Sequence, residues 1–186
     1  MSAKDPQAKE ELSFGNHIRT DGRYACIDGR YACMSDTRRV LFLCTHNSAR
    51  SQMAEGLLRS KFGEKYEAYS AGVEATSVNP HAIKVMSKIG IDISGYHSKS
   101  MKAFQGILFD IAVTVCDNAK VKTACSICGT TLQIASDKPT AKTIIHKSFI
   151  DPAASNGSEE EKLVIFRQVR DEIDTWITHI FGDQTN

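Results

Sequence analysis

The chain has 186 residues, which is enough for a single domain with a hydrophobic core and no stabilising disulfides. Its formal net charge of +1 and its lack of a long basic run argue against binding to nucleic acid or a membrane surface. No apolar stretch is long enough to span a bilayer, and no secretory signal precedes the first apolar run. We therefore expect a cytoplasmic protein whose six cysteines stay reduced.

Residues 1–37 differ in composition from the rest of the chain. They are polar and contain two consecutive copies of the sequence "DGRYAC", which are too few and too short for a repeat architecture. We predict that this segment is a disordered leader and that residues 38–182 form the catalytic domain. Either translation starts at Met34, or everything before Met34 is dispensable. Cys26 and Cys33 lie in the leader and are not expected to take part in catalysis.

From Val40 onward, short apolar runs alternate with amphipathic segments. Continuously apolar runs are typical of buried parallel strands, whereas apolar side chains three and four residues apart predict helices. Alternation of the two predicts an α/β domain with a mainly parallel sheet. We expect strands at residues 40–44, 66–72, 109–116 and 143–149, helices that stop at Gly63 and Gly90, and a last helix with an apolar stripe from Phe166 to Ile180.

The loop after the first strand holds the clearest chemical signal. Cys44 ends the strand, and Arg50 follows six residues later at the start of a helix. Backbone amides of such a turn, with the helix dipole, form a site for anions, and an arginine can grip two oxygens of a tetrahedral oxyanion. The same positive surroundings favour the reactive thiolate of Cys44, which the Ser51 hydroxyl could stabilise.

The alternative is a core cysteine followed by a surface arginine. A cysteine and an arginine at this spacing occur often by chance, but their position between a buried strand and an amphipathic helix makes the pattern specific. We therefore interpret Cys44 as a nucleophile aimed at a bound oxyanion. The predicted substrate-binding residues are Thr45, His46, Asn47, Ser48, Ala49, Arg50 and Ser51.

This stretch, "CTHNSARSQMAEGLL", closely resembles the phosphate-binding loop of the low-molecular-weight tyrosine phosphatase fold, and in particular that of thioredoxin-coupled arsenate reductases. The resemblance continues through "YSAG", "GIDIS", "VTVCDNA", "DPA" and "FRQVRDEI". It implies a four-stranded parallel sheet flanked by helices in a three-layer sandwich. It also implies an enzyme that converts arsenate to arsenite without a bound cofactor and takes its electrons from thioredoxin.

A second cysteine distinguishes a reductase from a phosphatase. Cys116 ends the third predicted strand, and the family fold implies that this strand neighbours the first, so that both sulfurs lie at one edge of the sheet. A dithiol that becomes a disulfide supplies the two electrons that arsenate reduction needs. In the implied relay, Cys116 attacks Cys44, and a third thiol then displaces Cys44 from the disulfide. Cys125 is the favoured third thiol and Cys128 the alternative.

Asp151 is the predicted general acid. It precedes a proline in "DPAAS", and its position before the last helix matches that of the acid in the resembled family, although Asp-Pro is also common in plain turns. Some of these reductases bind potassium near the loop, and the matching positions are Asn47, Glu55, Ser70 and Lys99. Because a lysine cannot bind a cation, we predict no potassium requirement and no metal site.

Two other functions fit parts of the pattern. A tyrosine phosphatase of the same fold would use Cys44, Arg50 and Asp151 through a phosphocysteine but would leave Cys116 without a role. A non-enzymatic oxyanion or arsenite binder would need neither a nucleophile nor an acid. A reductase recycled by glutaredoxin and a small thiol is a variant of the leading hypothesis.

Overall fold

The computed structural model describes residues 24–27, 30–33, 37–119 and 139–182. It divides into two compact units, Met1–Asp36 and Thr37–Asn186. Both candidates for the third relay thiol, Cys125 and Cys128, lie outside the described residues.

The first unit contains two short strands, β1 (Tyr24–Ile27) and β2 (Arg30–Cys33), which pair antiparallel. These strands differ from the prediction of a disordered leader. The sequence signal for them is Asp-Gly, which separates the two strands in the sequence and is a dipeptide typical of two-residue hairpin connections. That residues 1–37 form a dispensable leader and residues 38–182 the catalytic domain stays a prediction.

The second unit is built on a four-stranded sheet in the order β4-β3-β5-β6, in which every pair is parallel. This confirms the predicted fold class. The strands are β3 (Arg38–Cys44), β4 (Tyr66–Gly72), β5 (Leu108–Thr114) and β6 (Thr140–His146). Several boundaries differ from the prediction. β3 begins two residues earlier than expected, β5 begins one residue and ends two residues earlier, and β6 begins and ends three residues earlier.

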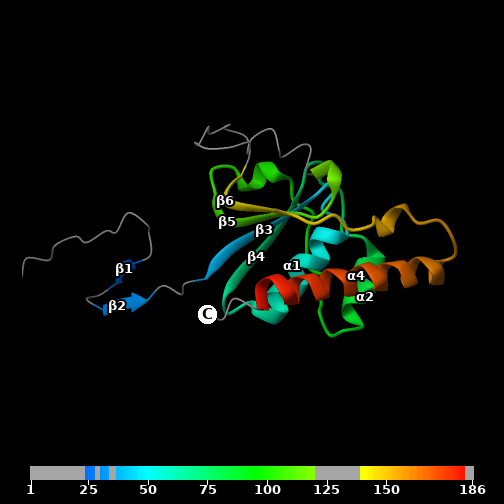
Figure 1. The fold of residues 1–186 in the computed structure, drawn as a ribbon, viewed down its shortest axis with the longest axis horizontal. Coiled ribbons are helices and arrows are strands. Elements are labelled where there is room, and N and C mark those ends of the chain that lie inside the picture. Colours follow the sequence, from blue (N-terminus) through cyan, green and yellow to red (C-terminus); the bar gives the residue numbers. More distant parts are fainter. Residues whose placement is uncertain (1–23, 28–29, 34–36, 120–138, 183–186) are drawn as a thin grey trace, which may run out of the picture. The chain divides into compact units, whose positions relative to one another are not determined.

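Helices α1 (Arg50–Phe62), α2 (Pro80–Ser87) and α4 (Glu159–Gly182) pack against one another and lie together beside the sheet in Figure 1. The start of α2 follows the predicted signal, since the side chain of Asn79 accepts a hydrogen bond from the backbone N–H of His81 and Pro80 occupies the first turn. A cluster of aromatic side chains joins α4 to this face of the sheet and consists of Phe42, Tyr66, Trp176 and Phe181.

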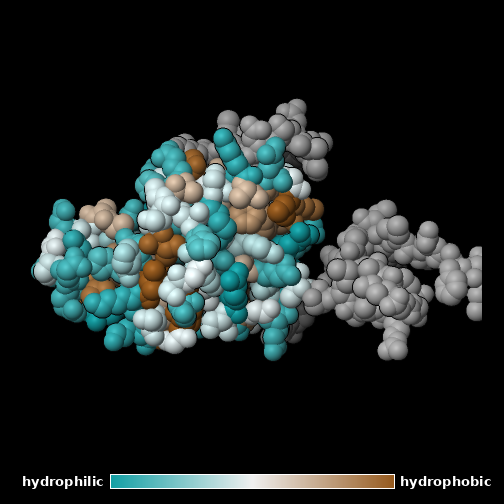
Figure 2. All heavy atoms as spheres, turned by 180° about the vertical axis from the view of Figure 1, so that it is seen from behind, coloured by the Kyte–Doolittle hydropathy of each residue, from teal (hydrophilic) through white to brown (hydrophobic). Residues whose placement is uncertain are grey.

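The opposite face of the sheet is covered in part by a short 3-10 helix, η1 (Met101–Phe104). The Phe104 ring packs edge-on against Tyr69 of β4 and Phe109 of β5. The face shown in Figure 2 is mostly hydrophilic, and its apolar residues gather in a narrow strip and in a second, separate group. Within the described part of the chain, no helix is both long enough and apolar enough to cross a membrane.

Phe181 anchors the aromatic cluster, with its ring centroid 5.0 Å from that of Tyr66, 6.1 Å from Trp176 and 6.4 Å from Phe42. Phe181→Ala should lower the free energy of unfolding by about 3–5 kcal/mol, because it leaves a cavity in the core. Urea unfolding measures this change. Val164→Ala, at a position 41% exposed on the same helix, is the control and should have little effect. Equal losses in the two variants would contradict the packing described here.

Candidate active site

The candidate site lies where the order of the strands reverses. From β3 the chain passes to β4 on one side, and it later returns to β5 on the other side. In open parallel sheets, ligands bind in the crevice beyond the carboxyl ends of the strands at such a point. Cys44 is the last residue of β3 and α1 begins at Arg50, so the intervening loop occupies that crevice.

The sulfur of Cys44 is buried and faces two hydrogen-bonding groups. The backbone N–H of Asn47 donates to it over 3.0 Å, and the Ser51 hydroxyl lies 2.9 Å away. The Nδ2 group of Asn47 donates to the Ser51 oxygen, which leaves the hydroxyl hydrogen of Ser51 available for the sulfur. Both groups are therefore placed to hold a sulfur anion.

The start of α1 is open to an anion. Ala49 at the N-cap position makes no side-chain hydrogen bond to the first turn, and that turn contains no acidic residue. The first amides of a helix have no partner within the helix, and its dipole favours negative charge at this end. The loop therefore presents amide donors beside the Cys44 sulfur.

Asn47 holds the loop in shape. Its φ of 50° is left-handed, a conformation that asparagine adopts more readily than most residues. Its fully buried side chain donates to Ser70 of β4 over 2.8 Å and accepts from the Gln52 amide and from the backbone N–H of Lys99. These bonds tie the loop to α1, to β4 and to the segment before η1.

The buried carboxylate of Glu55 ends this network. It accepts a hydrogen bond from the Ser70 hydroxyl over 2.5 Å, pairs with Arg59 at 2.9 Å, and lies 3.4 Å from the ammonium nitrogen of Lys99. The Lys99 ammonium also donates to the backbone oxygen of His97. The positive charge of Lys99 therefore lies beside the other residues matched to a potassium site, where those reductases bind the ion. Among the described residues, no cluster of potential metal ligands is found.

Arg50 and Asp151 form an ion pair on one side of the pocket. One guanidinium nitrogen of Arg50 lies 2.9 Å from a carboxylate oxygen of Asp151, and another donates to the backbone oxygen of Phe149. Asp151 caps the short 3-10 helix η2 (Pro152–Ala154), because its other oxygen accepts from the backbone N–H of Ala153. Residues from distant parts of the sequence, predicted separately as anion binder and acid, are therefore in contact.

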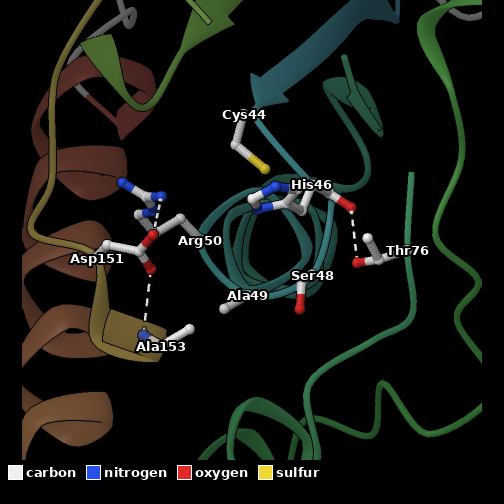
Figure 3. A pocket seen from close by; sticks show the side chains of 8 residues that line it. All are labelled: Cys44, His46, Ser48, Ala49, Arg50, Thr76, Asp151 and Ala153. Atoms are coloured by element: carbon white, nitrogen blue, oxygen red, sulfur yellow. Dashed lines mark hydrogen bonds and ion pairs between the residues drawn. The ribbon is translucent and has the colours of Figure 1, made fainter. Parts of the chain in front are cut away.

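A pocket of about 180 Å³ opens over the Cys44 sulfur (Figure 3). Its described walls come from the loop, from the start of α1, from the segment after β4 and from η2. They are formed by Cys44, His46, Ser48, Ala49, Arg50, Thr76, Asp151 and Ala153. These side chains are small or polar, and none of them is a phenyl or indole ring.

Cys116 lies at the same edge of the sheet as Cys44. The strands β3 and β5 are neighbours, and just beyond their paired residues the backbone N–H of Val115 donates to the oxygen of Leu43. The buried Cys116 sulfur is 3.4 Å from the hydroxyl of Thr45, the residue next to Cys44. A second pocket, of about 490 Å³, is lined by Cys116 and shares His46, Arg50 and Asp151 with the first.

Sequence reasoning did not foresee how the Cys116 segment is held. Asp117 accepts a hydrogen bond from Ser148 over 3.0 Å and lies 3.1 Å from a ring nitrogen of His146, whose other ring nitrogen contacts Thr114. His146 had no recognisable ligand spacing, so only the pairing of β5 with β6 reveals this contact. Ser148, predicted as part of the fourth strand, lies beyond its end.

Comparison with known sequences identifies a family. The sequence model of the family described as low molecular weight phosphotyrosine protein phosphatase matches residues 39–185. A curated relative from Halalkalibacterium halodurans, named arsenate reductase, is 43% identical over 134 residues, which are 72% of this chain and 88% of the relative. An arsenate reductase of Bacillus subtilis is 41% identical over 138 residues, 74% of this chain and 91% of that protein.

Solved structures give the same grouping. The structure of an arsenate reductase in the reduced state has a TM-score of 0.58 and 29% identity, covering 78% of this chain and 98% of its own. A low molecular weight protein tyrosine phosphatase from T. tengcongensis has a TM-score of 0.59 and 26% identity, covering 78% and 99%. The structural likeness therefore extends to both reductases and phosphatases.

Gly72 allows the close approach between β4 and the loop. A Cβ atom at this position would lie 2.7 Å from the backbone nitrogen of Asn47 and 2.8 Å from the carbonyl carbon of His46. Gly72→Ala should therefore displace the loop, lower the free energy of unfolding by about 1–3 kcal/mol and weaken phosphate binding. Urea unfolding and calorimetric titration with phosphate measure the two effects.

Gly95→Ala is the matched control, because a Cβ atom there would meet nothing within 4 Å. Its unfolding free energy should stay within about 0.5 kcal/mol of the parent value. If Gly72→Ala were as stable as this control and bound phosphate normally, the loop would not depend on the contact.

Proposed function

Because the chain belongs to the low molecular weight phosphotyrosine protein phosphatase family, we propose that it is an arsenate reductase that works through Cys44 and Cys116. The observation that carries the proposal is the position of Cys116, buried at the edge of the sheet where Cys44 lies and in contact with the adjacent Thr45. Hydrolysis of a phosphate ester does not need the Cys116 thiol. Reduction of arsenate requires two electrons, which a pair of thiols supplies when it forms a disulfide.

In the first step, arsenate binds to the loop amides and to Arg50. It takes the place of the Asp151 carboxylate on the guanidinium, and Asp151 in its protonated form donates a proton to the departing oxygen. The Cys44 thiolate attacks arsenic, so that a sulfur–arsenic bond replaces an arsenic–oxygen bond. The hydrogen bonds from Asn47 and Ser51 to the sulfur support this role.

In the second step, the Cys116 thiolate attacks the Cys44 sulfur. A sulfur–sulfur bond forms, the sulfur–arsenic bond breaks, and its electron pair stays on arsenic, which leaves as arsenite. The Thr45 hydroxyl and the backbone N–H of Ala119, each 3.4 Å from the Cys116 sulfur, are placed to orient this second nucleophile.

Regeneration needs a third thiol and an external reductant. We propose Cys125 in this role, with Cys128 as the alternative, and thioredoxin as the protein that reduces the resulting disulfide with Cys116. A cytoplasmic location, where thioredoxin and reduced thiols are present, fits this cycle.

The second candidate function is a phosphatase acting through a phosphocysteine, which the family match and the structural likeness to a tyrosine phosphatase support. The walls of the Cys44 pocket favour the reductase instead. Phosphotyrosine carries a phenyl ring. Among the described residues that line this pocket, Ala153, which follows Asp151-Pro152, offers a methyl group and none offers an aromatic ring of phenyl or indole type to pack against it. A bare tetrahedral oxyanion needs no such surface.

Replacement of Cys116 separates these two functions. Cys116→Ser should reduce thioredoxin-coupled, arsenate-dependent NADPH oxidation at least about 100-fold, because the arsenic adduct on Cys44 then has no internal reductant. Hydrolysis of p-nitrophenyl phosphate, which needs Cys44 but not Cys116, should persist in the same variant.

Cys33→Ser is the matched control and should keep full reductase activity. Cys125→Ser and Cys128→Ser, run in the same assay, identify the third relay thiol by which of them stops multiple turnover. A Cys116→Ser protein that still reduces arsenate at the parent rate would contradict the relay.

Lys99 makes a further prediction about ions. The Lys99 ammonium lies beside Glu55, near the oxygens matched to a potassium site. Exchanging sodium for potassium at equal ionic strength should therefore change kcat/KM by less than about twofold, because the screening of charges stays the same. Lys99→Asp removes this charge and adds a carboxylate, and is expected to make turnover respond to potassium. Potassium-specific activation of the parent protein would refute the prediction.

A further inference from the structure

The charges that line the Cys44 pocket do not favour an anion by themselves. The positive charge of Arg50 is already paired with the Asp151 carboxylate at 2.9 Å. A Cys44 thiolate adds a negative charge at the base of the pocket. A doubly charged oxyanion therefore meets a site in which the charges of these three side chains sum to one negative charge, and the loop amides alone must attract it.

His46 is the other residue that can carry a positive charge among the described residues lining this pocket. Figure 3 shows its ring across the pocket from Arg50 and Asp151. His46 also lines the second pocket, beside Cys116. Within the described part of the chain, no residue hydrogen-bonds to the ring, so its nitrogens are available to a ligand.

The backbone at His46 is held firmly without strain. Its carbonyl oxygen accepts hydrogen bonds from the Ser98 hydroxyl over 2.9 Å and from the backbone N–H of Thr76 over 3.2 Å. The left-handed residue of the loop is Asn47, whereas His46 has an ordinary negative φ. The fixed backbone therefore limits where the imidazole can point, and the side chain is not needed to shape the loop.

We propose that His46 is a substrate-binding residue whose protonated ring donates a hydrogen bond to an oxygen of the bound tetrahedral oxyanion that Arg50 does not hold. The ligand class is a doubly charged inorganic oxyanion such as arsenate or phosphate. The inference rests on the proposed oxyanion pocket, but it does not depend on the reduction step.

Charged and titratable groups of both signs line the same two pockets as His46. They are Cys44 and Arg50 of the loop and helix α1, Asp151 before η2, and Cys116 and Asp117 after β5. A protonated ring adds a positive charge and a hydrogen-bond donor to this set, and so offsets the negative charges that a bound oxyanion meets.

Phosphate protection of Cys44 from alkylation tests this proposal without any reductase activity. The full-length protein is treated with iodoacetamide over a range of phosphate concentrations, and modification of Cys44 is followed by mass spectrometry of its peptide. The proteins compared are the parent, His46→Gln, His46→Lys and the control His179→Gln, whose exposed side chain lies on α4.

His46→Gln should need about fivefold more phosphate for half-protection than the parent, because it loses a positively charged donor. His46→Lys, which keeps a positive charge at this position, should stay within about twofold of the parent. His179→Gln should match the parent.

Unchanged protection in His46→Gln would overturn the proposal while leaving the oxyanion pocket in place. Equal weakening by glutamine and lysine would also overturn it, because the positive charge would then play no part in binding. If phosphate fails to protect Cys44 in the parent, the oxyanion pocket itself is refuted and the role of His46 falls with it.

Discussion

The parallel pairing of β3 with β5 is the constraint on which the site depends. Its register sets Leu43 opposite Thr114, so the two strands end together and their following residues share one edge of the sheet. Cys44 and Cys116 thereby lie at the same edge of the sheet although they are far apart in the sequence. Because a one-residue slip in register would turn every side chain of a strand to the other face, the buried apolar residues of both strands also protect this arrangement.

A chain of buried hydrogen bonds links the loop to the protein interior. Glu55, held by Arg59 and Lys99, accepts from Ser70, which in turn accepts from the Asn47 amide; the same amide donates to Ser51. The bonds are oriented so that the Ser51 hydroxyl is left free to point at the Cys44 sulfur. The network leaves one buried acceptor of α1 without a partner among the described residues, Oε1 of Gln52. Its other hydrogen bonds hold the loop in place, so the polar residues of α1 are as much a part of the candidate site as Cys44.

The sequence predicted those parts of the molecule whose signals are local. Residues 66–72 form the expected strand, Asn79 caps the expected helix, and the Cys44–Arg50 loop lies between the expected strand and helix. The predicted strand at residues 143–149 extends beyond the observed end of β6 at His146. The apolar residues of this run do not indicate where the pairing of strands stops.

Contacts between distant segments could not be predicted in the same way. Neither Arg50 with Asp151 nor Asp117 with His146 has any signature in spacing, since each pair is set by how the strands are ordered. The resemblance to a known family predicted separate roles for Arg50 and Asp151, but it did not predict that their side chains are in contact. The second pair came from the structure alone. His46 was predicted as a substrate-binding residue, and the structure adds that its side chain lines the pocket.

The missing N-cap of α1 has a consequence for the stability of the protein. Most helices complete their first turn with a serine, threonine, aspartate or asparagine side chain, and Ala49 offers none. An oxyanion in the loop would accept hydrogen bonds from those same amides and would act as the cap that the sequence omits. Ligand occupancy and helix stability would then be thermodynamically linked, so that any oxyanion that binds the loop would also stabilise the folded protein.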